Sequence, residues 1–197
     1  MILGITGSIG SGKTTVAKLF TKHWYYGINA DEIGHIVIQE NLEVYKKLLT
    51  FFGDRILDKN KNIDRNRLGD IVFNDIKKMK KLNSITHPAI LKEIKNRIKE
   101  IKQKCKDKTK IVIDAPLLLE TNTKNLVDKI IVIKCNEDNI LKRNKKYPKE
   151  KIEKILKLQM PFKEKLKYAD FAIDNNKDLE HMKNQVEKII KMSEIFH

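Results

Sequence analysis

Cysteine is scarce in this chain of 197 residues, which contains only Cys105 and Cys135. Two cysteines are too few for a disulfide framework, and their spacing matches no metal-binding pattern. No apolar run approaches the length of a membrane span, so we expect no membrane partner. The first apolar segment begins at residue 1, so we expect no signal peptide. These absences predict a cytoplasmic protein whose thiols are reduced.

Acidic residues are also in the minority, with 26 Asp and Glu against 41 Lys and Arg and a formal net charge of +15. A positive charge of this size suits anionic partners, both nucleotides and nucleic acids. The excess is mostly lysine, spread along the chain and accompanied by abundant Ile and Asn, a trio that an A+T-rich coding sequence produces. No groove-reading motif accompanies it. We therefore expect small anionic ligands and no nucleic acid, while the oligomeric state stays open.

A glycine-rich segment near the start carries the strongest chemical signal, because residues 7–14 read GSIGSGKT. Residues 1–6 form an apolar run typical of a buried strand, and residues 15–20 have helical spacing. A strand, a glycine-rich turn and Gly-Lys-Thr at a helix start form the arrangement of a phosphate-binding loop. A turn that only connects a strand to a helix is the alternative. We predict that this loop binds a nucleoside triphosphate.

Each part of this loop has an expected role at the phosphates. Glycines let backbone N–H groups converge on one point, and the helix start adds unpaired donors and the positive end of its dipole. Lys13 is expected to reach the β- and γ-phosphates, and the Thr14 hydroxyl to bind Mg²⁺. The ATP-binding residues predicted from the loop are Gly7, Gly10, Ser11, Gly12, Lys13, Thr14 and Thr15.

Apolar segments alternating with helical ones predict the fold class. The segments that we interpret as buried strands are residues 1–6, 26–30, 111–113, 129–133 and 171–173. Strands alternating with helices imply an α/β protein with a five-stranded parallel sheet wound by helices on both faces. Ligands of such a sheet bind at the carboxyl ends of its strands, so chemistry is expected there.

A block with only helical patterns, residues 54–106, lies between the second and third expected strands. We interpret the chain as one domain with a core of residues 1–53 and 107–197 and this block as a helical insert. The alternation of strand and helix on both sides of the block supports a single sheet.

Several local signals predict where helices begin and end. Asp64 is expected to cap a helix. Residues 76–85 are expected to form a short helix, and Pro88 to be the first residue of a separate long one. Trp24 and Tyr25 lie at a helix end, where we expect both to pack against the protein.

With the whole chain in view, the sequence resembles the dephospho-coenzyme A kinases from end to end. The matching segments are residues 4–17 (GITGSIGSGKTTVA), Ala30-Asp31, Phe52-Gly53, residues 63–68, Val72-Phe73, His87-Pro88, residues 116–120 (PLLLE), Arg143, Gln159, Ala169-Asp170 and Asp174-Asn175. The loop alone fits many kinases, whereas the later motifs in this order are far more specific. The resemblance implies a P-loop kinase that uses ATP and Mg²⁺ to phosphorylate the 3′-hydroxyl of the ribose of dephospho-coenzyme A, the last step of coenzyme A synthesis.

The resemblance also implies the catalytic residues. Asp31 matches the family's proposed base, and its alternative role is a helix N-cap. Arg143 matches an arginine of a mobile lid, about residues 138–165, that stabilises charge on the transferring phosphoryl group; the alternative is an exposed helical arginine. Asn175 matches the position at the adenine of ATP. Lys13 completes the set.

Binding roles follow from position in the chain for Asp114 and from the resemblance for Arg65 and His87. Asp114 ends a strand beside the loop and either holds Mg²⁺ through water or forms a turn. Arg65 matches a position that grips the acceptor's phosphates, and its alternative is a solvated arginine. His87 either contacts the acceptor or starts a helix. Glu120 either supports the structure or positions the acceptor.

Two departures from the family pattern matter. The family usually has Asp-x-Asp at the second strand, and here the first position is Asn29, which removes a negative charge near the metal. The lid looks shorter than usual, and Lys145 or Lys146 stands where a second arginine is often found. Lysine neutralises charge without the bidentate fork of arginine, so either the lid closes less tightly or the lysines suffice.

Two other functions fit parts of the pattern. A related kinase acting on a nucleoside monophosphate, shikimate or gluconate would share the loop and lid. A basic nucleic-acid-binding ATPase would share the loop and the charge, but the charge is dispersed and no Asp-Glu pair follows a strand.

Overall fold

The computed structural model describes residues 1–105, 109–145 and 147–195. It divides into two compact units: a core unit, Met1–Asn29 with Arg97–His197, and a helical unit, Ala30–Asn96. The helical unit takes in α2 (Ala30–Glu40) and α3 (Leu42–Phe52) as well as much of the segment expected to be an insert.

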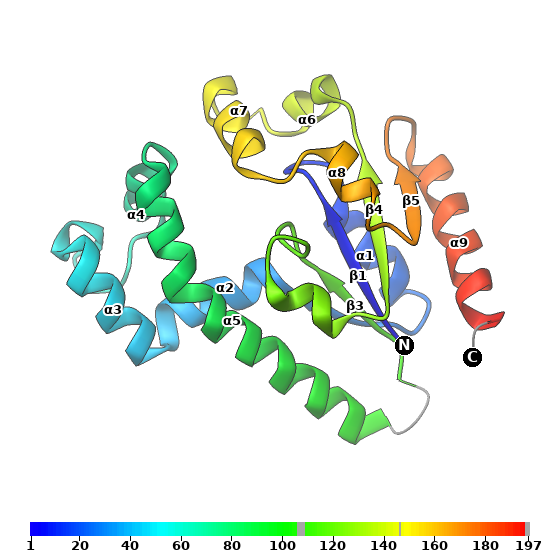
Figure 1. The fold of residues 1–197 in the computed structure, drawn as a ribbon, viewed down its shortest axis with the longest axis horizontal. Helices are drawn as coiled ribbons and strands as arrows, with labels where there is room; N and C mark the ends of the chain where they lie inside the picture. Colours follow the sequence, from blue (N-terminus) through cyan, green and yellow to red (C-terminus); the bar gives the residue numbers. More distant parts are fainter. Residues whose placement is uncertain (106–108, 146, 196–197) are drawn as a thin grey trace. The chain divides into compact units, whose positions relative to one another are not determined.

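The core unit is built on a sheet of five strands, all parallel, in the order β2-β3-β1-β4-β5 (Figure 1). The strands are β1 (Ile2–Gly7), β2 (Tyr26–Asn29), β3 (Ile111–Asp114), β4 (Lys129–Lys134) and β5 (Phe171–Asp174). Every residue of β1 is buried. A strand covered on both faces needs a continuous apolar run rather than alternation, which is what the sequence has there. The predicted parallel α/β sheet is confirmed.

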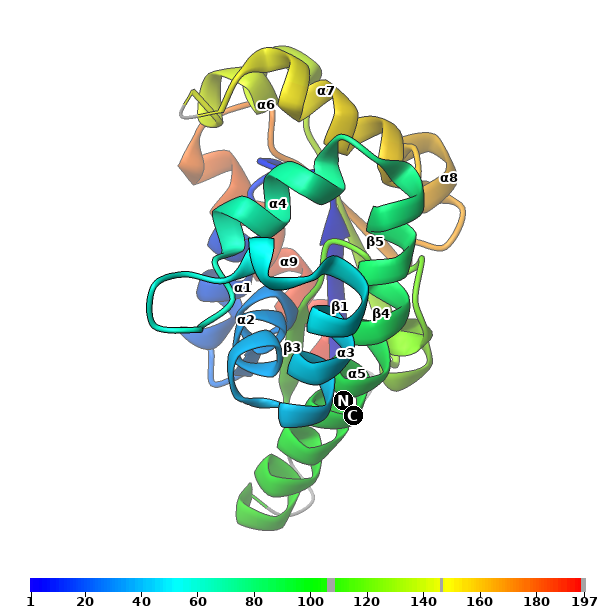
Figure 2. The same ribbon diagram turned by 90° about the vertical axis from the view of Figure 1, so that its left-hand side faces the viewer.

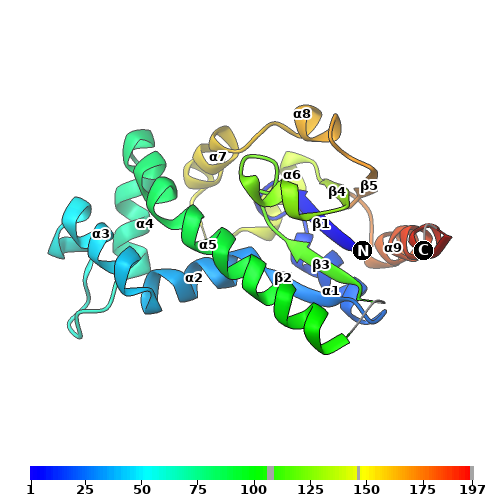
Figure 3. The ribbon, with the colours of Figure 1, turned by 60° about the horizontal axis from the view of Figure 1, so that its bottom comes forward.

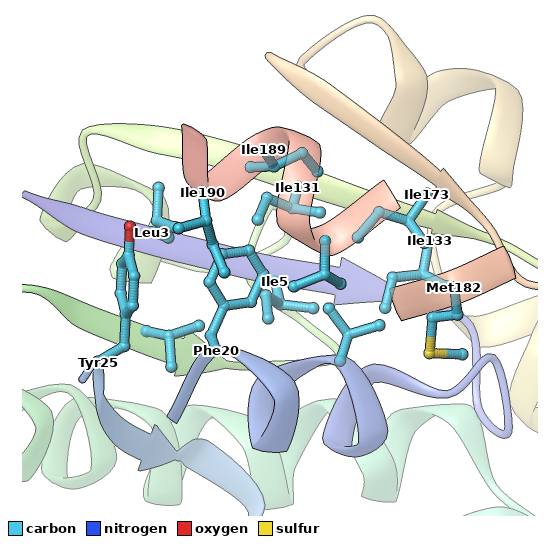
Figure 4. Packing of buried hydrophobic residues seen from close by; sticks show 13 residues of the cluster. Leu3, Ile5, Phe20, Tyr25, Ile131, Ile133, Ile173, Met182, Ile189 and Ile190 are labelled. Carbon is cyan, nitrogen blue, oxygen red and sulfur yellow. The ribbon is translucent and has the colours of Figure 1, made fainter. Parts of the chain in front are cut away.

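One face of the sheet is covered by α1 (Lys13–Thr21) and α9 (Leu179–Ile195), which also contact each other. Figure 4 shows the apolar side chains between these helices and the strands. Phe20 is fully buried and meets Tyr25 edge-on, with ring centroids 5.1 Å apart and ring planes at 76°. The other buried members are Leu3, Ile5, Val16, Val112, Ile131, Ile133, Ile173, Met182, Val186, Ile189 and Ile190.

The opposite face of β1 is approached closely by the segment that follows β3. A Cβ on Gly4 would lie 2.6 Å from Leu118 Cδ2 and 3.0 Å from Val127 Cγ1, so a larger residue here would require these side chains to shift. Thr6 projects from the same face as Gly4, because side chains alternate along a strand. Its hydroxyl accepts a hydrogen bond from Lys165 of α8 (Phe162–Leu166). Helices and loops therefore cover both faces of the sheet.

Figure 2 looks toward the helices of the helical unit, which are α2, α3, α4 (Arg65–Phe73) and the first part of α5 (Ile76–Cys105). The N-terminus of α3 is capped by Asn41, whose side-chain oxygen accepts from the backbone N–H of Val44 at 3.0 Å. Asp64 caps α4 in the same way and accepts from two backbone N–H groups, at 2.9 and 3.2 Å. The predicted cap at Asp64 is confirmed, and such a cap stabilises a helix by about 1 kcal/mol.

The prediction that Pro88 begins a separate helix is wrong. α5 runs without interruption from Ile76 to Cys105 and contains Pro88 in its interior. Proline removes one helical hydrogen bond and crowds the preceding turn, which costs about 3 kcal/mol. Thr86 and Ile94 are buried on either side of Pro88, so the helix packs before and after the proline. The other hydrogen bonds of a helix of 30 residues offset the one that proline removes.

The expectation that Trp24 packs against the protein is also wrong, because its side chain is 89% exposed. The chain reverses between α1 and β2 with Trp24 in the left-handed region, at a φ of 67°. That reversal directs the next residue, Tyr25, into the core, where it contacts Phe20. Only Tyr25 behaves as the sequence predicted.

Among the described residues, three short helices lie between β4 and β5: α6 (Glu137–Arg143), α7 (Lys149–Leu158) and α8 (Figures 1 and 3). We call residues 138–165 the lid segment; Lys146, one of the lysines considered above, lies outside the described residues. None of the helices described in the structure is long and apolar enough to span a membrane.

Replacing Phe20 with alanine tests how much the core unit depends on this cluster. We expect Phe20→Ala to lower the free energy of unfolding by about 3–5 kcal/mol, because a large buried ring leaves a cavity. Urea denaturation followed by circular dichroism measures it. Tyr168→Ala, which truncates an exposed ring of the same unit, is the control and should change the value by less than about 1 kcal/mol.

Candidate active site

All five strands run parallel, so their carboxyl ends lie at one edge of the sheet, and the glycine-rich loop leaves β1 at that edge. Gly10 and Gly12 have φ values of 69° and 96°, in the left-handed region that glycine adopts without steric cost. The N–H of Ser11 donates to the carbonyl of Ser8 at 3.1 Å and closes the turn. Gly12 immediately precedes α1, so the backbone N–H groups of the loop lie at a helix N-terminus.

Lys13 and Thr14 open α1 and point to different partners. The Lys13 ammonium donates to the carbonyl of Ser8 at 3.0 Å, which holds it against the loop's own turn. Its side chain is buried, so solvent and salt screen its interaction with a nearby negative charge only weakly. The ammonium therefore lies beside the N–H groups of the loop, and its contact with the β- and γ-phosphates stays a prediction.

The Thr14 hydroxyl donates to Asp114 Oδ2 at 2.7 Å. Asp114 is the last residue of β3, is buried, and lies beside Ile5 of β1 in the sheet register. A hydroxyl and a carboxylate held side by side are hard oxygen donors of the kind that Mg²⁺ prefers, and Mg²⁺ sites commonly use one or two carboxylates plus substrate phosphates. The residues present therefore fit a magnesium ion.

Asn175 follows β5 and has a structural contact that the sequence did not predict. Its side-chain amide donates to the carbonyl of Ser11 at 2.6 Å, and the residue is buried. The amide therefore supports the phosphate-binding loop from behind. A contact between Asn175 and the adenine of ATP stays a prediction.

Arg143, at the end of α6, lies against this same support. Its guanidinium donates to the backbone carbonyl of Asn175 at 3.1 Å and to Cys135 Sγ at 3.4 Å. Burial raises the pKa of the Cys135 thiol, so at neutral pH the arginine faces an uncharged sulfur. The structure thus brings Arg143, Asn175 and the loop together at the carboxyl edge, and the role of Arg143 in catalysis stays a prediction.

Gln159 is a loop contact to which sequence reasoning gave no role. Its side-chain oxygen accepts from the backbone N–H of Ile9 at 3.1 Å, linking the residue after α7 to the loop. The motif match included Gln159, but no spacing rule connects it to a residue 150 positions away.

The predicted acceptor-side residues belong to the helical unit. Asp31 is exposed and lies in the first turn of α2, which begins one residue earlier at Ala30, so Asp31 is inside the helix rather than its cap. One turn later, His35 has a lowered pKa, because it is partly buried and the positive charge of Arg65 acts on it. His87 is half-buried within α5, and burial lowers its pKa too. Both imidazoles are therefore neutral at pH 7 and can donate and accept hydrogen bonds.

Comparison with solved structures first shows the fold. The shikimate kinase from Acinetobacter baumannii, solved in complex with shikimate, superposes with a TM-score of 0.51 over 97% of this chain and 91% of that chain. At 14% identity this is a likeness of fold alone. Together with the glycine-rich loop and the Thr14–Asp114 pair, that fold defines a P-loop kinase.

Sequence comparison then shows the family. The family model described as dephospho-CoA kinase matches residues 1–181. The dephospho-CoA kinase of Aquifex aeolicus is 39% identical over 191 residues, which cover 95% of this chain and 94% of that protein. The solved dephospho-CoA kinase from Campylobacter jejuni has a TM-score of 0.68 and 31% identity, covering 96% of this chain and 95% of that chain. The chain belongs to the dephospho-CoA kinase family, as its motifs predicted.

Truncating Asn175 tests the support behind the loop. We expect Asn175→Ala to weaken ATP binding about tenfold, because the Ser11 carbonyl loses a buried partner and the loop loses its fixed shape. Isothermal titration calorimetry with a non-hydrolysable ATP analogue measures this. Asn184→Ala removes an exposed amide from α9 and should leave the affinity unchanged.

Proposed function

We propose that this protein transfers the γ-phosphoryl group of ATP to the 3′-hydroxyl of the ribose of dephospho-coenzyme A, giving coenzyme A and ADP. The observation that carries the proposal is a family match over residues 1–181 in a chain whose loop and Thr14–Asp114 pair have the geometry of a nucleotide site. The two free cysteines support a cytoplasmic location.

On the nucleotide side, the loop's N–H groups and the Lys13 ammonium bind the β- and γ-phosphates. Their charge stabilises the negative charge that spreads over the oxygens of the transferring group. Thr14 and Asp114 would hold Mg²⁺, which neutralises phosphate charge when it is bound. Asn175 keeps the loop in the shape that presents these donors.

On the acceptor side, Asp31 acts as the general base. The ribose 3′-oxygen attacks the γ-phosphorus as its proton passes to the Asp31 carboxylate, and the bond from the γ-phosphorus to the bridging oxygen breaks to release ADP. The exposed position of Asp31 in the first turn of α2 supports this role, because a substrate can reach the residue from solvent.

Three further residues bind charge or position the acceptor. Arg143 stabilises the transferring phosphoryl group, and its contact with the carbonyl behind the loop supports that role. Arg65 grips the acceptor's phosphates from the N-terminus of α4. His87, neutral at pH 7, donates or accepts a hydrogen bond to the acceptor without adding charge.

Two departures from the family pattern have specific consequences in this scheme. Asn29 ends β2 where the family usually has a carboxylate, so Asp114 is the residue that supplies negative charge to the metal. Lys145 offers an exposed ammonium where the family often has a second arginine, so Arg143 alone supplies a bidentate fork in the lid segment.

The direct test is incubation of the purified protein with Mg-ATP and dephospho-coenzyme A, followed by mass spectrometry and phosphorus NMR. We expect one added phosphate at the 3′ position, and Lys13→Ala should remove most of the turnover because the γ-phosphate loses its cation. Lys18→Ala, an exposed lysine on the same helix, is the matched control and should be fully active. Transfer to shikimate, gluconate or a nucleoside monophosphate in place of dephospho-coenzyme A would overturn the assignment.

The role of Asp31 is tested by a change that keeps its shape and removes its charge. We expect Asp31→Asn to lower kcat by about 10²–10⁴, with ATP affinity largely unchanged, because general base catalysis contributes factors of this size. Steady-state kinetics and ATP titration measure the two effects. Glu40→Gln, at the other end of α2, is the control. A loss confined to ATP affinity would assign Asp31 to the metal instead.

A further inference from the structure

Two lysines are buried among the residues that the structure describes, Lys13 and Lys165. Lys13 belongs to the phosphate-binding loop. Lys165 lies in α8, its side chain is 1% exposed, and the reaction scheme above gives it no role. Burial disfavours the charged form and lowers the pKa of Lys165, while the nearby Glu120 opposes this shift. A buried charge that the fold retains at this cost needs an explanation.

Lys165 uses its ammonium to join separate parts of the core unit. Nζ donates to the carbonyl of Pro116 at 2.8 Å and to the Thr6 hydroxyl at 3.2 Å, and it pairs with Glu120 at 3.0 Å. An ammonium has three donors, and these three partners use all of them. Thr6 comes immediately before the phosphate-binding loop, and Pro116 follows two residues after Asp114. One cation therefore ties α8 to the ends of the strands that carry the loop and the Thr14 partner.

Glu120 extends this connection to the chain that leaves α7. Its Oε1 atom, which faces Lys165, also accepts from the backbone N–H of Met160 at 2.9 Å. The neighbouring residue, Gln159, accepts from the N–H of Ile9 in the phosphate-binding loop. Gln159 and Met160, which follow α7 and which we call the exit of the lid segment, are thus attached to the loop and to the Lys165–Glu120 pair, respectively.

Stability alone gives a weak reason for this pair. The Lys165 ammonium is buried while the Glu120 side chain is 20% exposed, and taking the ammonium out of water costs free energy that its attraction to Glu120 must offset. The positioning of active-site groups is a stronger reason. A misplacement of such groups by about 1 Å lowers the reaction rate about 10²-fold, even when the mutated residue is far from the reacting atoms.

We propose that Lys165, together with Glu120, is a positioning residue for phosphoryl transfer, which fixes the exit of the lid segment to the carboxyl edge of the sheet so that Gln159 stays on the phosphate-binding loop. The inference rests on the proposed function and adds to it a residue that touches neither substrate. Its effect is transmitted through Met160, Gln159 and the loop N–H of Ile9.

The test compares Lys165→Met, which keeps an unbranched chain and removes the charge, with Glu120→Gln and the double variant. We expect Lys165→Met to lower kcat about 10–100-fold, with the KM values for ATP and dephospho-coenzyme A within about threefold of the unchanged protein. The double variant should be no slower than Lys165→Met alone, because the two residues act as one unit. Lys163→Met, an exposed lysine on the same helix, should have no effect.

Hydrogen exchange followed by NMR gives a second readout that does not depend on turnover. The amides of Met160 and Ile9 should exchange faster in Lys165→Met, while amides in the middle of α1 keep their protection. Circular dichroism checks that the variant is folded; if it is not, Glu120→Gln, which keeps a hydrogen-bond acceptor, carries the same test with a smaller effect.

Three results would overturn the proposal: unchanged kcat in Lys165→Met, additive losses in the double variant, or unchanged exchange at Met160 and Ile9. The activity of the unchanged protein on dephospho-coenzyme A is measured first and tests the proposed function separately. If that activity is absent, the exchange measurement still decides whether Lys165 fixes the exit of the lid segment.

Discussion

The position of β1 in the middle of a parallel sheet is the constraint on which the nucleotide site depends. β1 pairs with β3 on one side and β4 on the other, so the loop that follows it emerges between two further strand ends. The register places Ile5 beside Asp114, and the Asp114 carboxylate lies 2.7 Å from the hydroxyl of Thr14, the second residue of α1. The apolar run that buries β1 thus determines where the polar groups meet.

Two neutral amides hold the backbone of the loop, and an ion pair between the buried Lys165 and the partly exposed Glu120 holds neighbouring segments. Asn175 donates to a loop carbonyl and Gln159 accepts from a loop N–H, so both bind the backbone without adding charge near the phosphates. Lys165 and Glu120 lie behind the same edge and compensate each other. In the proposed function, the positive charge at the nucleotide comes from Lys13, the helix N-terminus and the lid segment, while the supporting residues contribute shape.

Sequence reasoning succeeded where the physical cause is local. Glycine spacing and a continuous apolar run are local patterns, and the rule that strand ends share an edge was enough to bring Thr14 and Asp114 together across 100 positions. The contact from Asn175 to Ser11 spans 164 positions and depends on side-chain geometry that no spacing encodes. Pro88 was misjudged because the local preference of proline was outweighed by packing along a long helix. The acceptor-side role of Asp31 follows from the family resemblance, which is information about relatives rather than about local physics.

Two glycines of the loop cannot be replaced unless the amide side chain beside each of them changes too. A Cβ on Gly10 would lie 2.0 Å from the amide nitrogen of Asn144, and a Cβ on Gly12 would lie 2.2 Å from that of Asn175. Each amide is held in place by its own hydrogen bond, to Ile140 and Ser11 respectively, so it cannot swing aside without losing that bond. Replacement at either glycine therefore requires a compensating change at its amide partner and acceptance of a strained backbone. Over evolutionary time, we therefore expect each glycine and its amide partner to change together or to stay unchanged. A single substitution at either position would be selected against, which is epistasis between the two positions.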